Sequence, residues 1–168
     1  GLIESDPNLV VIPREAINVF YIGMNNTIRP FDNPKVRPAF AMGFDRDRIL
    51  NTFYPGGSNR ADWFTPCTIE FGCEGEAWYE YDPEAAAELM AEGLIEEGFV
   101  DDDGNPKLST EIHLRVVDRS YLPFPLQVAI DIKDQLETNF SNVGMKALID
   151  EQESGTFIDN SDKGLLPG

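Results

Sequence analysis

Apolar residues recur at helical spacing in several stretches of the chain. The clearest helix start is Asp82-Pro83-Glu84, an N-cap side chain followed by a proline and an acid, and the pattern predicts a helix to about Glu97 with Gly98 as its stop. Further helices are expected after Asn33-Pro34, after the cap Asp45, over residues 126–140, and over residues 154–162 with Ser154 as the cap. The inward face of the helix over 126–140 is expected to hold Val128, Ala129, Ile132, Leu136 and Phe140.

Three other stretches have the composition or the alternation of β-strands. Residues 15–24 are rich in Val, Ile, Phe and Tyr and precede an Asn-Asn turn, residues 109–118 alternate apolar and polar positions, and residues 143–150 follow the helix over 126–140. A strand, a helix and a strand at this spacing form a βαβ unit, in which the two strands are parallel. The expected fold class is therefore α/β.

Residues 56–81 follow neither period and contain many aromatic residues, so we interpret them as a long ordered loop. Cys67 and Cys73 lie within it, close enough in sequence for a disulfide that would hold the loop together. A pair of free thiols is the alternative. A disulfide would indicate an oxidising compartment.

Composition sets the size and the charge of the molecule. The 168 residues are 42% apolar and carry a net charge of −17, which fits a single domain with a real core, or one lobe of a larger protein. A chain this acidic, with its basic residues scattered, repels phosphate backbones and anionic lipids, so nucleic-acid and membrane-surface binding are disfavoured.

Candidate catalytic groups do not form a recognisable set. Glu74, Glu76 and Glu80 lie beside Trp63, Trp78 and Tyr79, an arrangement that a carbohydrate-active enzyme could use, but nothing in the sequence raises the pKa of one acid above another. The turn that starts at Asp101 departs from the calcium-loop pattern, and His113 lies mid-strand with no nucleophile motif to serve. The sequence therefore predicts no catalytic residues, no metal site and no cofactor.

Two blocks of motifs carry a resemblance to a known family. The first is Pro30-Phe31-Asp32-Asn33 with Val36-Arg37, Ala39 and Asp45-Arg46, and the second runs from Tyr81-Asp82-Pro83-Glu84-Ala85 through Leu89-Met90 to Glu92. In this order they resemble the family 5 solute-binding proteins of ABC transporters, the peptide- and nickel-binding type, over nearly the whole chain. The second block departs from the family where Gly93 follows Glu92 directly, and the next glycine with an aromatic residue after it is Gly98, so a helix about one turn longer is expected.

The resemblance implies a fold and a function. Residues 1–168 would form one domain, most of the second lobe of a periplasmic-binding-protein type II fold, with a mixed sheet, flanking helices and the aromatic loop at 56–81. Such a lobe would help capture a peptide or another small solute between two lobes, outside the cytoplasm, and deliver it to the permease without chemistry. The membrane association of this lobe would come through the parent protein.

The family's cleft-facing connection maps onto Arg119, Ser120 and Tyr121, which are the expected ligand-binding residues. Arg119 would pair with a peptide carboxylate, and Tyr121 would cover an apolar side chain. The alternatives are a carbohydrate-active secreted enzyme domain that uses the carboxylates of the aromatic loop and a stand-alone binding module. An isolated lobe would also expose open sheet edges, which favour self-association.

Overall fold

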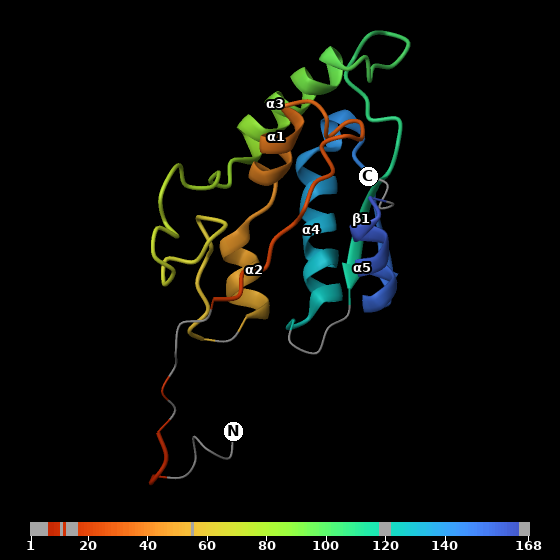
Figure 1. Ribbon diagram of the computed structural model, residues 1–168. Coiled ribbons are helices and arrows are strands. Elements are labelled where there is room, and N and C mark those ends of the chain that lie inside the picture. The colour runs from red at the N-terminus through yellow and green to blue at the C-terminus, as the bar shows by residue number, and fades with distance from the viewer. Residues whose placement is uncertain (1–6, 11, 13–16, 55, 118–121, 165–168) are drawn as a thin grey trace. The chain divides into compact units, whose positions relative to one another are not determined.

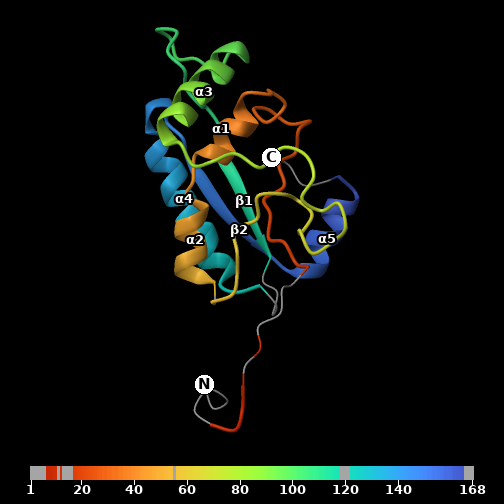
Figure 2. The same ribbon diagram turned by 90° about the vertical axis from the view of Figure 1, so that its left-hand side faces the viewer.

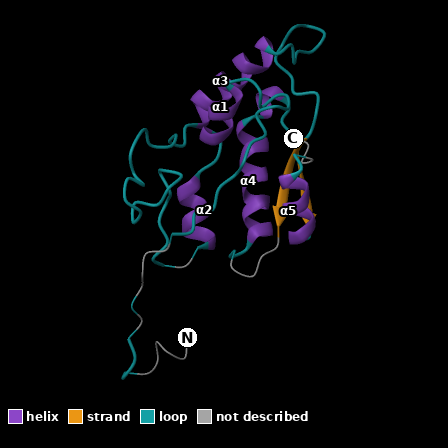
Figure 3. Ribbon diagram, in the orientation of Figure 1, coloured by secondary structure: helices purple, strands orange, loops and turns teal. Residues whose placement is uncertain are grey.

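The computed structural model describes residues 7–10, 12, 17–54, 56–117 and 122–164. These divide into two compact units, one built from residues 1–21 and 55–78, the other from residues 22–54 and 79–168. The described helices and strands all belong to the second unit, and the described part of the first consists of loops and turns (Figure 3).

The second unit begins with two short helices, α1 (Val36–Met42) and α2 (Arg46–Phe53). The predicted cap of α2 is confirmed, because the Asp45 carboxylate accepts a hydrogen bond of 3.0 Å from the Arg48 backbone N–H. The predicted start of α1 at Asn33-Pro34 is wrong by two residues. Asn33 Oδ1 accepts from the Lys35 N–H at 2.8 Å, and this local side-chain turn keeps residue 34 outside the helix.

The third helix, α3 (Pro83–Glu96), matches its prediction closely. The Asp82 carboxylate accepts from the Ala85 N–H at 3.0 Å, and Gly98 follows the helix at a φ of 76°, a conformation that glycine adopts readily. Helix α3 packs against α1, and it comes close because residue 93 has no side chain. A Cβ at Gly93 would lie 2.9 Å from Val36 Cγ2.

The predicted βαβ unit is present. It consists of β1 (Ile112–Val117), α4 (Pro125–Asn139), the short 3₁₀ helix η1 (Ser141–Val143) and β2 (Ala147–Gln152), and α5 (Ser154–Asp162) follows it. The strands are parallel with Ile112 opposite Ala147 and Val117 opposite Gln152, and they are the only sheet in the described part of the chain. Helix α4 packs against both strands (Figures 1 and 2).

One core connects the helices with the sheet of this unit. The five apolar residues predicted for the inward face of α4 are all buried there. Its largest fully buried side chains are Phe40, Phe140, Met90, Leu94, Leu136 and Met145. The βαβ unit and the helix pair α1–α3 therefore form one packed body and not two.

The strand predicted over residues 15–24 is wrong for its described part. Residues 17–24 have no strand pairing, and Ile17 and Tyr21 are exposed. A strand forms only where a neighbour accepts its backbone hydrogen bonds, and no described segment pairs with these residues. Strand propensity alone does not supply that neighbour.

The aromatic loop has the irregular structure that its sequence predicts, with no helix or strand from residue 56 to residue 81. Cys67 and Cys73 form the predicted disulfide, with their Cα atoms 4.9 Å apart. Between them the chain turns tightly, because the Gly72 N–H donates to Ile69 O at 2.8 Å. A Cβ at Gly72 would lie 2.0 Å from Pro66 O, so only glycine fits this turn.

Candidate functional site

The carboxyl edge of the parallel strand pair is the best candidate for a ligand site in the second unit. Parallel strands end at the same edge, where open α/β sheets bind their ligands, and here the last residue pair is Val117 and Gln152. The connection from β1 to α4 leaves from this edge. It contains Arg119, Ser120 and Tyr121, which lie outside the described residues, so their role stays a prediction.

Phe124 lies where this connection joins α4, and sequence reasoning missed it. Its φ of 50° is left-handed, which is uncommon for an aromatic residue, and 58% of it is exposed. The Phe124 ring therefore offers exposed apolar surface three residues after Tyr121 in the sequence. Pro125 directly after it was a visible helix signal, but nothing in the sequence indicates the left-handed backbone.

The other half of this edge comes from the end of β2 and the start of α5. The Glu153 carboxylate accepts hydrogen bonds of 2.9 Å from the backbone N–H groups of Gly155 and Thr156, and these bonds lower its pKa. The cap of α5 is thus Glu153, and the prediction of Ser154 is wrong, because the longer side chain reaches back over the first turn. Beside it, Gln152 Oε1 is buried without a hydrogen-bond donor among the described residues.

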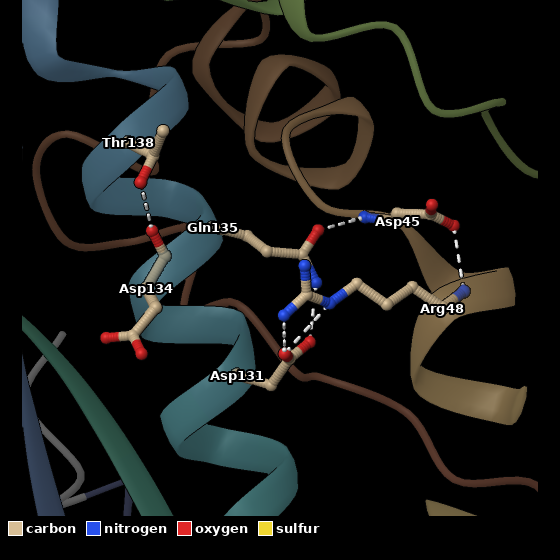
Figure 4. Close-up of polar contacts among 6 residues, drawn as sticks. All are labelled: Asp45, Arg48, Asp131, Asp134, Gln135 and Thr138. Carbon is tan, nitrogen blue, oxygen red and sulfur yellow. Dashed lines mark hydrogen bonds and ion pairs between the residues drawn. The ribbon is translucent and has the colours of Figure 1, made fainter. Parts of the chain in front are cut away.

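A polar network holds α4 against α2 (Figure 4). Asp131, 8% exposed, accepts from Arg48 Nε at 3.0 Å and Nη2 at 2.7 Å through one carboxylate oxygen, and from Gln135 Nε2 at 2.6 Å through the other. Gln135 Oε1 in turn accepts from the Asp45 backbone N–H at 2.7 Å. The network therefore ties the start of α2 to the helix that follows the β1–α4 connection.

A second set of contacts ties α4 to β2. Glu137 accepts from the Ala147 backbone N–H at 2.9 Å and forms an ion pair of 3.1 Å with Lys133. The Ala147 hydrogen bond is the main reason that the pKa of Glu137 lies below the ordinary carboxyl value. Helix α4 is thus fixed on two sides by polar contacts as well as by the core.

His113 has a partner that sequence reasoning did not identify. Its Nδ1 lies 2.8 Å from the Asp150 carboxylate, across the strand pair. It also lines a hollow of about 560 Å³ at the amino end of β1, together with Arg29, Ser109, Thr110, Glu111 and Ile112. The contact with Asp150 orients the imidazole ring.

The residues named for the enzyme alternative are brought together only in part. Glu74, Glu76, Trp63 and Trp78 line one hollow of about 300 Å³ in the first unit. Glu80 and Tyr79 belong to the second unit and do not line it. The structure thus gathers Glu74, Glu76, Trp63 and Trp78 around a hollow, without Glu80 and Tyr79.

The acidic turn at Asp101 is organised by its own backbone. The Asp101 carboxylate accepts from the N–H groups of Asp103 at 3.0 Å and Asn105 at 2.9 Å, and the Asn105 bond is the main cause of its lowered pKa. Over the described ranges, no three His, Cys, Asp or Glu residues are grouped as metal ligands would be. Nor is any helix in those ranges long and apolar enough to cross a membrane.

Comparison with known proteins identifies relatives along most of the chain. The sequence profile of bacterial extracellular solute-binding proteins, family 5 Middle, matches residues 2–164. Heme-binding protein A of Haemophilus influenzae is 29% identical over 143 residues, which are 85% of this chain and 24% of that protein. The dipeptide-binding protein of Escherichia coli is 26% identical over 161 residues, 96% of this chain and 28% of that protein.

A solved structure of a solute-binding protein has a similar fold. The Haemophilus influenzae OppA complex with RPPGFSPFR superposes with a TM-score of 0.63 at 25% identity, covering 83% of this chain and 26% of that one. These proteins are solute-binding proteins and not enzymes, which favours the binding interpretation over the carbohydrate-active one. The chain spans about a quarter of the length of the relatives that it matches.

Proposed function

The chain belongs to the bacterial extracellular solute-binding proteins of family 5, and we propose that it helps to capture a peptide-like solute outside the cytoplasm for delivery to the permease of an ABC importer. The observation that carries this proposal is the family match over residues 2–164. Relatives named for dipeptides and a solved relative in complex with a nonapeptide support a peptide-like solute. In this proposal the chain performs no chemistry on the solute.

The chain would form most of the second lobe of a two-lobed receptor, with its ligand-facing residues on the β1–α4 connection. Arg119 would pair with a carboxylate of the solute, and Tyr121 would cover an apolar side chain. The exposed ring of Phe124 would extend that apolar surface. Because binding energy in such receptors comes from closure of two lobes, this lobe alone should bind weakly.

Calorimetric titration of the protein that contains this chain tests the proposal. The probes are Ala-Phe, the same dipeptide with an amidated carboxyl end, glutathione and haem. Saturable one-to-one binding of a peptide-like probe, recovered unchanged by mass spectrometry, is the expected result. Turnover of a probe would overturn the proposal, as would binding of none of them.

Substitution of Arg119 tests its assignment separately. Arg119→Ala should weaken Ala-Phe about tenfold or more, because a charge-assisted hydrogen bond is lost, and should leave the amidated peptide unaffected. Lys107→Ala is the control, since it removes the same charge from an exposed turn at residues 101–107. Equal losses for the two variants would remove Arg119 from the site.

The isolated chain should self-associate through its strand pair, since each strand of β1–β2 has a neighbour on one side only within the described residues. Light scattering across a concentration series measures this directly. A monomer at every concentration would count against open edges as a docking surface. Association with the membrane, in this proposal, comes through the parent protein and not through the helices described here.

A further inference from the structure

Two cross-links close the part of the aromatic loop that contains the hollow. The disulfide closes the turn from Cys67 to Cys73, and the Trp78 N–H donates to Asp62 O at 2.7 Å, which closes the wider loop. Between these two closures lies the hollow of about 300 Å³. That volume is at the lower end for ligand sites, so it suits one side chain better than a whole peptide.

The walls of the hollow combine aromatic rings with carboxylates. Its lining residues are Asp62, Trp63, Phe64, Thr65, Phe71, Gly72, Glu74, Glu76 and Trp78. They include four aromatic rings and three acids but no Lys, Arg or His. Aromatic faces and carboxylates both attract cations, so the two kinds of wall favour the same kind of ligand.

Several of these side chains reach the surface. Phe64 and Phe71 are each 71% exposed, and Trp78 is 47% exposed. Asp62 already pairs with Arg60 at 2.8 Å, whereas Glu74 and Glu76 are exposed and form no ion pair within the described ranges. Within the described residues, therefore, no basic side chain pairs with the negative charge of these two acids.

A sugar would also stack on aromatic rings, but the charge of the hollow separates the two ligands. The lining could offer a sugar donors from Thr65 and the two tryptophan indoles and acceptors from the carboxylates, but a neutral sugar would leave the negative charge of those carboxylates unmatched. A guanidinium or ammonium group supplies donors alone, together with the opposite charge and a surface that stacks on aromatic faces. The lining therefore favours a cationic side chain.

We propose that the hollow within residues 62–78 binds the guanidinium or ammonium group of an arginine or lysine side chain in a peptide. The ring faces of Trp78 and Phe71 would contact the cation, and Glu74 and Glu76 would neutralise it. This site rests on the hollow's own geometry and uses other residues than the proposed solute site does. It holds or fails independently of that function.

Tryptophan fluorescence tests the proposal on the whole 168-residue chain. Trp63 and Trp78 are its only tryptophans and both line the hollow, so emission reports on this place alone. The probes are Ala-Arg-Ala and Ala-citrulline-Ala, which differ mainly in the charge of one side chain. The arginine peptide should change the emission in a saturable way and bind about fivefold tighter or more, because citrulline loses the cation–π attraction.

Isosteric variants locate the effect. The double variant Glu74→Gln, Glu76→Gln should weaken Ala-Arg-Ala about fivefold, and added salt should weaken wild-type binding further. Glu70→Gln is the matched control, because Glu70 is an exposed acid of the same loop that does not line the hollow. Equal affinities for the two peptides, equal losses in the control, or a response to maltotriose without one to Ala-Arg-Ala would overturn the proposal.

Discussion

Removal of the Asp131 carboxylate should destabilise the second unit far more than removal of a neighbouring acid on the same helix. In Asp131→Ala, the Gln135 amide loses its acceptor in a buried place, and Arg48 loses both of its hydrogen bonds to the carboxylate. Breaking a buried charge pair typically costs about 3–5 kcal/mol. Because the Arg48 side chain is 60% exposed and is hydrated again in the variant, we expect a smaller loss of unfolding free energy, about 2–3 kcal/mol.

Urea unfolding followed by far-UV circular dichroism measures this cost. The described helices all lie in the second unit, so the helical signal reports on that unit. With a slope of about 2 kcal/mol per molar urea, the expected loss lowers the midpoint by about 1–1.5 M. A variant with an altered slope would need a second probe before its free energy of unfolding is compared.

Asp134→Ala is the matched control. Asp134 lies on the same helix, its side chain is 68% exposed, and its backbone oxygen accepts from Thr138 in a bond that the substitution leaves in place (Figure 4). Its cost should stay within about 0.5 kcal/mol. If the two variants unfold at the same urea concentration, the network does not hold α4 as argued here.

Three further perturbations have defined outcomes. The pKa of Glu137 is lowered in the folded state, so its hydrogen bond with the Ala147 N–H stabilises the fold at pH values above the ordinary carboxyl pKa of 4.5. This stabilisation is lost as the pH falls through the folded pKa. Glu137→Gln should therefore flatten the decline of the urea midpoint on acidification below about pH 5. Gly43→Ala should cost about 1–3 kcal/mol by urea unfolding, because its Cβ would lie 2.5 Å from the Phe140 ring, whereas Gly56→Ala meets nothing within 4 Å and should be near neutral. Alkylation of the unfolded, unreduced protein from an oxidising compartment should label neither cysteine by mass spectrometry, and labelling of both would rule out the disulfide there.

Local signals explain which elements the sequence could predict. Asp45 and Asp82 cap their helices through hydrogen bonds that span three residues, so the information lies within the segment itself. The βαβ unit is similarly local, because a helix of this length between two strands leaves little choice of topology. The disulfide joins residues only six apart.

The errors fall where two local options compete. Asn33 forms its own side-chain turn and delays the start of α1, and Glu153 outcompetes Ser154 as the cap of α5 because it reaches two N–H groups. Both segments contain residues that could stabilise either of two helix starts, and the two starts differ by only one or two hydrogen bonds. The periodicity of apolar residues carries no information on that choice.

Long-range partners account for the remaining differences. Asp131 and Gln135 are polar residues on the inward face of α4, and the apolar pattern gives them no role until α2 supplies Arg48, 83 residues away, and the Asp45 N–H, 90 residues away. Residues 17–24 are the opposite case, since their strand propensity finds no described neighbour. In both cases the sequence shows the side chains but not their partners in the fold. The partner matters because a buried carboxylate without one destabilises the fold, whereas a fully hydrogen-bonded one holds two elements together.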